Sequence, residues 1–405
     1  MEKGPIVAGL DVGTTKICAI VGQAVEGKMN ILALGASPSK GLRKGMVVNI
    51  ETTVESIINA VKDAERAAGV EINSVCVGIA GGHIKSFESY GAVGIRSREV
   101  TRGDVDRALE AAKAVYVPLD REVLHVLPVE YVVDGQDGIM NPVGMSGVRL
   151  EVRVQIVTGS VSAVQNLIRC CEKAGLQVID IVLEPLASAL STLTDDEKSQ
   201  GVVLVDIGGG TTDIAFYRNG VLSHTSVIAV GGNHFTNDLA IGLRLPVQEA
   251  ERVKKLYGMA MAVHDDKEKS VRIMVAGRDE KTIPRSYITE IIQPRCEEVI
   301  DLVKNELKKA GAYDEVSYGI VLTGGGSQLS GLDRMAEAIL GLPIRVGMPV
   351  NVGGVKNIVS DPMYSTGVGL LVYGSETELP PINYGDLFGN ILKKMKGWVR
   401  GFLRR

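Results

Sequence analysis

Short apolar runs separated by glycine turns open the chain, and they predict a first third rich in β-strands. Three such runs lie between residues 5 and 37, and a fourth at 74–80 has the length of a buried strand. Between them, apolar residues recur at helical spacing from Ile50 to Ala68, and Gly69 follows where a helix C-cap is expected. The opening pattern therefore predicts successive strands, a helix and a further strand.

The pattern changes between residues 84 and 161, where a predicted helix at 103–114 is flanked by strands of alternating polarity. We interpret this segment as an inserted α+β lobe. A helix at 162–174 and a strand at 176–183 follow it. The acidic stretch 195–200 is predicted to be a loop.

Beyond residue 200 the opening pattern returns. The pair Asn219-Gly220 predicts a two-residue hairpin turn, because both residues tolerate positive φ. Helices are predicted at 249–257 and 287–310, and a strand with a glycine turn at 318–326.

These elements predict an α/β protein with two similar halves and several additions. The expected organisation is 1–83 plus 162–195 for the first core, 84–161 for the inserted lobe, 196–228 plus 307–374 for the second core, 229–306 for an outer lobe of the second half, 375–386 for a linker rich in proline and polar residues, and 387–405 for an amphipathic helix.

Two similar turns carry the candidate chemistry. The segments GLDVGTTKI (9–17) and LVDIGGGTTDI (204–214) each combine a buried strand, an aspartate, a glycine turn and two threonines. One copy in each half indicates a duplicated domain around a shared cleft. Glycines let backbone N–H groups approach phosphate oxygens, and threonine hydroxyls add donors. Asp11 and Asp206 can hold a hydrated Mg²⁺, and Lys16 can face a β-phosphate.

A single turn of this kind is most often only a β-hairpin. The second copy and a third glycine cluster at 322–332 favour a phosphate site. Neither turn matches G-x-x-x-x-G-K-[ST] or G-x-G-x-x-G, so the P-loop and Rossmann interpretations lose their main support.

Composition narrows the class of protein. A chain of 405 residues is too long for one ordinary core. The net charge is −4 although residues 391–405 carry six cations, so the body of the chain is acidic, which argues against nucleic-acid binding. Five cysteines without CxxC spacing, and a start without a charged-then-apolar leader, indicate a cytosolic protein with reduced thiols and no zinc site. No apolar run reaches the roughly 20 residues that span a bilayer.

These motifs resemble the signatures of the actin, hexokinase and heat-shock-chaperone ATPase superfamily. Within it, the chain is similar over essentially its whole length to the FtsA family of bacterial cell-division proteins. The similarity is carried by NPVGMSGVRLEV, VLEPLASAL, VDIGGGTTDIA, GIVLTGGGSQLSGL, YSTGVGLLVYG and the C-terminal sequence. The resemblance implies actin-like duplicated domains around a central nucleotide cleft, with an inserted α+β lobe in the first half and a C-terminal amphipathic helix.

The resemblance also implies a function and a set of site residues. The expected protein binds ATP and Mg²⁺, polymerises, and tethers the tubulin-like protein FtsZ to the cytoplasmic face of the cell membrane at the division site, where the septum machinery assembles. The phosphates would be cradled by Gly13, Thr14, Thr15 and Lys16 from one side and by Gly208, Gly209, Gly210, Thr211 and Thr212 from the other. Asp11 and Asp206 would face the metal. The adenosine would be lined by Gly324, Gly325, Gly326 and Ser327.

Three further residues in the expected site have two interpretations each. Glu251 and Lys254 would contact the ribose or adenine, or they form only a solvated pair one helical turn apart. Glu184 matches an acid near the attacking water in related ATPases, where it would be a general base, or it caps the helix that begins near Pro185. The five histidines have no ligand spacing, and we expect slow ATP hydrolysis at most, with the nucleotide acting as a clamp between the halves.

The implied partners fall on the two lobes. The inserted lobe would take part in filament contacts and recruit later division proteins, and the outer lobe would bind the C-terminal peptide of FtsZ. Arg285 and Arg295 could pair with acidic groups of that peptide, although surface arginines often have no specific role.

The C-terminal residues predict a membrane-binding helix. Its apolar positions are Leu387, Phe388, Ile391, Leu392, Met395, Trp398, Val399, Phe402 and Leu403, and its basic positions are Lys393, Lys394, Lys396, Arg400, Arg404 and Arg405. The spacing gathers the apolar side chains on one stripe. At 1.5 Å per residue, 390–405 is about 24 Å long, short of the roughly 30 Å hydrocarbon core. The helix is therefore expected to lie in the interface of an anionic membrane, or alternatively to dock on its own domain or a partner.

Three classes of function remain open on these patterns. The first is a membrane-tethered cytoskeletal adaptor, which the whole-length resemblance and the C-terminal sequence support. The second is a small-molecule kinase on the same fold, and the third is a related ATP-binding adaptor of pilus assembly. Neither of these two has an evident use for a basic amphipathic end.

Overall fold

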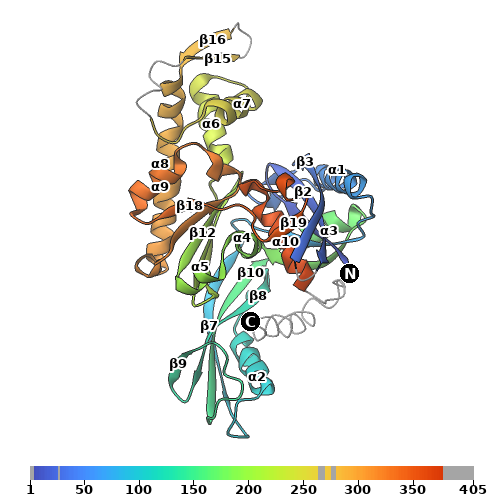
Figure 1. The fold of residues 1–405 in the computed structure, drawn as a ribbon, viewed down its shortest axis with the longest axis vertical. Helices are drawn as coiled ribbons and strands as arrows, with labels where there is room; N and C mark the ends of the chain where they lie inside the picture. Colours follow the sequence, from blue (N-terminus) through green and yellow to red (C-terminus); the bar gives the residue numbers. More distant parts are fainter. Residues whose placement is uncertain (1–3, 26–27, 263–269, 275–279, 377–405) are drawn as a thin grey trace.

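Two sheets of matching topology form the body of the molecule (Figure 1). The computed structural model describes residues 4–25, 28–262, 270–274 and 280–376. The first sheet has the order β11-β6-β1-β2-β3-β19, and its strands are β1 (Ile6–Val12), β2 (Lys16–Val25), β3 (Lys28–Pro38), β6 (Ser74–Ile79), β11 (Gln177–Leu183) and β19 (Val352–Gly354). The second has the order β14-β13-β12-β17-β18, and its strands are β12 (Val202–Ile207), β13 (Thr212–Arg218), β14 (Val221–Ile228), β17 (Gly319–Thr323) and β18 (Ile344–Val346).

The two sheets repeat one connectivity. In each sheet, three consecutive strands pair antiparallel. The first of these strands also pairs parallel with a later strand, which is β6 in the first sheet and β17 in the second. That later strand pairs parallel with one more strand, β11 or β18. The duplication predicted from the two turns is therefore confirmed. β12 is buried at every residue, as expected for a strand covered on both faces.

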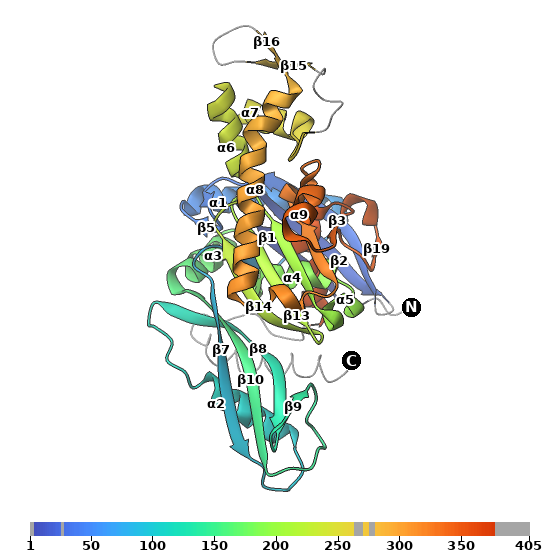
Figure 2. The same cartoon turned by 90° about the vertical axis from the view of Figure 1, so that its left-hand side faces the viewer.

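Helices cover these sheets and carry the outer lobe. They are α1 (Ile50–Ala68), α3 (Val161–Lys173), α4 (Glu184–Thr192), α5 (Asp195–Gln200), α6 (Gly232–Leu243), α7 (Val247–Tyr257), α8 (Arg285–Lys309), α9 (Leu332–Leu340) and α10 (Ser365–Glu376), with single 3₁₀ turns at Tyr313–Glu315, Gly325–Gln328, Lys356–Ile358 and Pro362–Tyr364. The long α8 runs from the outer lobe along the second sheet (Figure 2). In the part of the chain that the structure describes, no helix is long and apolar enough to cross a membrane.

Helix α1 shows how local sequence sets an element. The Asn49 side chain accepts a hydrogen bond from the Thr52 backbone N–H at the start, and Gly69 ends the helix at φ +68°. The predicted bounds of this helix are confirmed. The hairpin turn is also confirmed, since Asn219 and Gly220 have φ of +53° and +81°.

The inserted lobe is a four-stranded sheet with α2 (Arg102–Lys113) packed on it, at the end of the molecule opposite the outer lobe (Figure 1). Its order is β7-β10-β8-β9, with strands β7 (Lys85–Gly94), β8 (Arg121–Val133), β9 (Gln136–Ile139) and β10 (Arg149–Ser160). The lobe has its own apolar core, but Leu124, Leu127 and Val157 join the core of the first half. The base of the lobe is therefore continuous with the body. Two small hairpins complete the strands, β4 (Leu42–Arg43) with β5 (Met46–Val47), and β15 (Ser270–Met274) with β16 (Glu280–Pro284) in the outer lobe.

The stretch 195–200, predicted as a loop, is instead helix α5. Thr194 and Glu197 form a capping box, and Glu197 is buried against Arg345, whose Nε lies 2.6 Å from its carboxylate. This stretch lacks apolar periodicity, so the hydrophobic pattern did not reveal a helix that is held by its cap and by one ion pair.

The predicted extent of the second core, to residue 374, is also corrected. β19 pairs with β3, and α10 packs against β1 and α4 of the first half. A Cβ on Gly369 would overlap the Ala187 carbonyl, so the approach of α10 to α4 requires glycine. Helix α10 also runs to Glu376, two residues into the predicted linker. The rest of that linker and the predicted amphipathic helix 387–405 lie outside the described residues.

Candidate functional site

The two predicted turns, in segments 9–17 and 204–214, are in direct contact. A Cβ on Gly209 would overlap the side chain of Thr15, and a Cβ on Gly210 would stand 2.6 Å from Thr14 Oγ1. Only glycine permits this approach. The structure therefore brings the two turns together from different halves, each at the end of a buried strand, β1 or β12.

Backbone N–H groups without partners line this meeting point. Among the described residues, the amides of Thr14, Thr15, Gly209 and Gly210 donate no hydrogen bond within the protein. Successive free amides in a turn form an anion-binding concavity. The two turns could therefore hold a phosphate group, and the phosphate site stays a prediction. The hydroxyls of Thr211 and Thr212, in contrast, already donate to Asp213 Oδ2 and the Val230 carbonyl.

The third glycine turn stands beside Asp206. Gly324 has φ +79°, and a Cβ there would overlap Asp206 Oδ1. The Ser327 hydroxyl donates to the Gly324 carbonyl at 2.7 Å, so it stabilises its own turn. The exposed Gly325 lies between them. The residues predicted to line adenosine are therefore next to the predicted metal-facing carboxylate.

Asp206 is fixed by hydroxyls from two helices. Ser188 Oγ on α4 donates to Asp206 Oδ2 at 2.7 Å, and Thr366 Oγ1 on α10 donates to the same oxygen at 3.2 Å. Burial raises the pKa of Asp206, and these two hydrogen bonds and the charge of Lys16 oppose that rise. One carboxylate oxygen is thus held by the protein, which orients the other.

Carboxylates from both halves lie close enough to influence one another's pKa values. Burial raises the pKa of Asp11 to about 6, against the charge of Lys16 and with a further rise from Asp206. Burial, followed by the charges of Asp11, Asp213 and Asp206, raises the pKa of Glu184 well above its ordinary value. The site is therefore short of positive charge.

A divalent cation fits this donor set. Mg²⁺ keeps several waters and is bound through one or two carboxylates, which matches Asp11 and Asp206 across the cleft. No cluster of three or more potential metal-ligating side chains occurs among the described residues, so a fully protein-ligated site is not formed by them.

Asp213 belongs to this group, although the sequence patterns did not select it. It pairs in register with Asp206 across β12 and β13, and its Oδ1 is buried without a partner within the described chain. Burial and the charge of Asp206 raise its pKa to about 8. The repeat itself held a signal, because Asp213 follows the two threonines of the second turn where Lys16 follows those of the first.

Lys16 lies in the site but is held by the C-terminal part of the chain. Its Nζ donates to the Met363 carbonyl at 2.9 Å and lies 4.0 Å from the centre of the Tyr364 ring. Its charge still opposes the rise in the pKa values of Asp11 and Asp206. The ammonium group is therefore close to the carboxylates, as a phosphate-facing cation requires.

Glu251 and Lys254 form an ion pair, and it is more than a solvated one. Lys254 Nζ lies 2.7 Å from Glu251 Oε2 and also donates to Thr236 Oγ1 and to the Gly232 carbonyl. The Gly232 N–H in turn donates to the Gly208 carbonyl of the second turn. The pair on α7 therefore stabilises the second turn indirectly, through Gly232.

Glu184 does not cap helix α4, so the capping alternative is wrong. Leu183 occupies the N-cap, no side chain caps the helix, and Glu184 lies in its first turn. The Leu183 N–H donates instead to His125 Nε2 of the inserted lobe at 3.0 Å. Glu184 is thus placed at the cleft by β11 and α4, among the carboxylates described above.

The two candidate partner-binding arginines lie on α8 in the outer lobe, apart from the turns that form the cleft. Arg295 pairs with both carboxylate oxygens of Asp238, at 2.8 and 3.1 Å, and also with Glu298. The Nε of Arg285 donates to the Tyr257 carbonyl at 3.1 Å. Both guanidinium groups therefore have intramolecular partners.

The duplicated sheets and the facing turns define an actin-like fold, and solved structures agree. The type IV pilus biogenesis complex PilM-PilN matches with a TM-score of 0.68 and 18% identity, over 92% of this chain and 99% of that one. MreB5 of Spiroplasma citri bound to ADP matches with a TM-score of 0.53 and 18% identity, over 90% of this chain and 94% of that one.

Sequence comparison then assigns the family. The family model for cell division protein FtsA matches residues 203–369, that for the SHS2 domain inserted in FtsA matches 81–158, and that for Hsp70 protein matches 163–241. The cell division protein FtsA of Pseudomonas aeruginosa is 45% identical over 99% of both chains. The chain belongs to the FtsA family of actin-like cell-division proteins.

Proposed function

We propose that this chain binds ATP with Mg²⁺ between its two halves, forms filaments, and tethers FtsZ to the cytoplasmic face of the cell membrane at the division site. The main support for the nucleotide site is the contact between the two glycine–threonine turns. Free amides lie where the turns meet, and Asp11 and Asp206 lie beside them. The ADP-bound MreB5 of the same fold supports this proposal.

In this proposal each part of the site has one task. The free amides of the two turns bind phosphate oxygens, Asp11 and Asp206 hold hydrated Mg²⁺, and Lys16 faces the β-phosphate. Mg²⁺ supplies positive charge between the carboxylates. Because the turns belong to different halves, a ligand held by both favours the closed arrangement of the halves. Glu184, which lies among the carboxylates of the site, accepts the proton of an attacking water in slow hydrolysis.

The nucleotide site is tested by calorimetry with purified full-length protein. ATP is expected to bind with Mg²⁺ present and weakly in its absence, and filaments are expected to pellet only with Mg²⁺ and ATP. Equal affinity for ATP with and without Mg²⁺ would contradict the metal assignment.

The proposed partner sites lie at opposite ends of the molecule. The inserted lobe contributes to filament contacts and recruits later division proteins. On the outer lobe, Arg295 binds an acidic group of the FtsZ C-terminal peptide, either together with Asp238 or in place of Asp238.

Arg295→Ala is then expected to weaken binding of the peptide about 10-fold, because a charged hydrogen bond contributes about 1.5–3 kcal/mol. Arg252→Ala is the matched control, since Arg252 pairs with Glu249 in the same lobe. Equal losses in the two variants would contradict a specific role for Arg295.

The membrane anchor is proposed from the sequence of 387–405, which lies outside the described residues. Deleting it is expected to abolish pelleting with anionic vesicles while leaving ATP binding unchanged, and neutral vesicles serve as the control. Full pelleting of the truncated protein would contradict the anchor and favour the pilus-type adaptor among the alternatives.

A further inference from the structure

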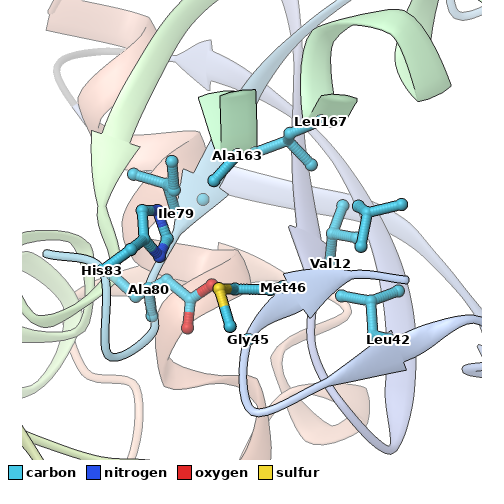
Figure 3. A pocket seen from close by; sticks show the side chains of 12 residues that line it. Val12, Leu42, Gly45, Met46, Ile79, Ala80, His83, Ala163 and Leu167 are labelled. Atoms are coloured by element: carbon cyan, nitrogen blue, oxygen red, sulfur yellow. The ribbon is translucent and has the colours of Figure 1, made fainter. Parts of the chain in front are cut away.

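A small cavity lies beneath the first turn, between the β4–β5 hairpin, β6 and α3 (Figure 3). Its volume is about 10 Å³, close to the space needed by one water molecule. The lining is apolar, with side chains such as Val12, Met46 and Leu167, except for two polar side chains, His83 and Glu184. A cavity lined by an imidazole and a carboxyl group is suited to a bound water.

His83 needs such a partner. Neither of its ring nitrogens has a hydrogen-bond partner within the described chain, although both are buried. A buried polar group without a partner costs about 1–3 kcal/mol, so an empty cavity would be unfavourable. Burial and the nearby charge of Arg121 lower the pKa of His83. The neutral ring then has one nitrogen that donates and one that accepts.

The position of His83 is fixed from its backbone. Arg121 on β8 donates from Nη2 to the His83 carbonyl at 2.8 Å, and its Nε donates to Thr158 Oγ1. The β4–β5 hairpin closes the cavity on another side, and the Gly45 N–H of that hairpin donates to Thr14 Oγ1 in the first turn. The cavity is therefore tied both to the inserted lobe and to the predicted phosphate turn.

We propose that one water molecule occupies this cavity and hydrogen-bonds His83 to Glu184, and that His83 is thereby a positioning residue for Glu184 in ATP hydrolysis. The inference rests on the proposed nucleotide site and adds a residue to it. Without the shared water, the Glu184 carboxyl has no anchor on the side of the cavity and samples orientations that do not face the attacking water. A small loss of orientation at the reacting group lowers the rate without weakening ground-state binding.

The test separates positioning from binding. His83→Ala is expected to lower kcat for ATP hydrolysis about 10-fold, with KM and calorimetric ATP affinity within about twofold of wild type. His83→Asn and His83→Gln place an amide near Nδ1 and Nε2 respectively. At least one of them is expected to return kcat to within about threefold of wild type, which a purely structural role for the ring does not predict.

Two matched variants control for disturbance of the fold. Met46→Leu alters the same cavity without a polar atom, and His224→Asn alters a second histidine, on β14, whose Nε2 has no partner within the described residues. Both are expected to leave kcat unchanged. A loss in Met46→Leu equal to that in His83→Ala would overturn the positioning role and leave only packing.

A crystal structure of the full-length protein with a non-hydrolysable ATP analogue tests the water directly. One water is expected within hydrogen-bond distance of a His83 nitrogen and a Glu184 carboxyl oxygen. A dry cavity, or His83→Ala with wild-type kcat, would overturn the inference. If wild type binds ATP but hydrolyses none, the role of His83 fails while the nucleotide site stands; if ATP does not bind, the proposed function fails first.

Discussion

The two turns of the duplicated fold share a sequence pattern, but residues of opposite charge type follow their threonines. The first ends in Lys16, which is partly exposed and rests on the Tyr364 ring. The second ends in Asp213, which is 3% exposed and carries an oxygen without a partner in the described structure. One half therefore supplies a cation to the cleft, and the other adds a buried acid. The two copies therefore keep the glycine–threonine pattern but differ in the residue that follows it.

The largest expected effect distinguishes the two aspartates of the second turn. Asp206→Asn is expected to lower Mg²⁺–ATP affinity by at least about 30-fold, because removing one member of a close charge pair costs about 2–5 kcal/mol. Asp213→Asn is expected to change it less than about threefold, since a carboxyl with a pKa of about 8 is largely protonated at neutral pH. Calorimetry at pH 7 measures both. Similar losses in the two variants would mean that Asp213 also faces the metal as a carboxylate.

A smaller effect is expected at the cation of the first turn. Lys16→Met keeps the length of the side chain and removes its charge, and it is expected to weaken ATP binding about 10-fold, because charged hydrogen bonds contribute about 1.5–3 kcal/mol. AMP, which lacks the β-phosphate, is expected to lose little. Lys16→Arg is the control, since a guanidinium retains the charge and also stacks on Tyr364. An equal loss for AMP would place Lys16 away from the β-phosphate.

The smallest effect concerns stability without nucleotide. Between the ordinary value of 3.8 and about 8, native Asp213 retains a proton that the unfolded chain has released, so this residue makes the free energy of unfolding fall as pH rises. Asp213→Asn removes that dependence and is expected to be more stable than wild type at pH 8 by at least about 1 kcal/mol, with little gain at pH 4. Urea unfolding in the presence of a chelator measures the difference at each pH. A constant difference across this range would assign the effect to packing.

Local chemistry made several elements predictable. α1 was predictable because its apolar spacing, its cap residues and Gly69 agree within one short segment. The two turns were predictable because glycine and threonine occur twice in the same order. α5 was not, because it is stabilised by a capping box and by Arg345, which is distant in sequence. The assignment of β19 and α10 to the first half likewise depends on pairing across the whole chain.

The candidate site divides in the same way. Asp11, Asp206 and the glycines were found from their spacing. Asp213 was missed because an acid after a threonine indicates no function by itself, and only the strand pairing places it opposite Asp206. His83 was missed because one histidine without ligand spacing carries no signal. His83 became a candidate only because its ring nitrogens are buried and because it lines one cavity with Glu184. The cavity is formed by segments that precede and follow the inserted lobe in the sequence.

The order of residues thus specified the repeat, the two glycine–threonine turns and most helices, since these depend on contacts between near neighbours. Folding in three dimensions specified which carboxylates lie near one another, in which direction burial and mutual repulsion shift their pKa values, and which half receives α10. Those properties depend on the distances between groups that the sequence separates by tens to hundreds of positions, and Coulomb interactions and desolvation follow distance and burial alone.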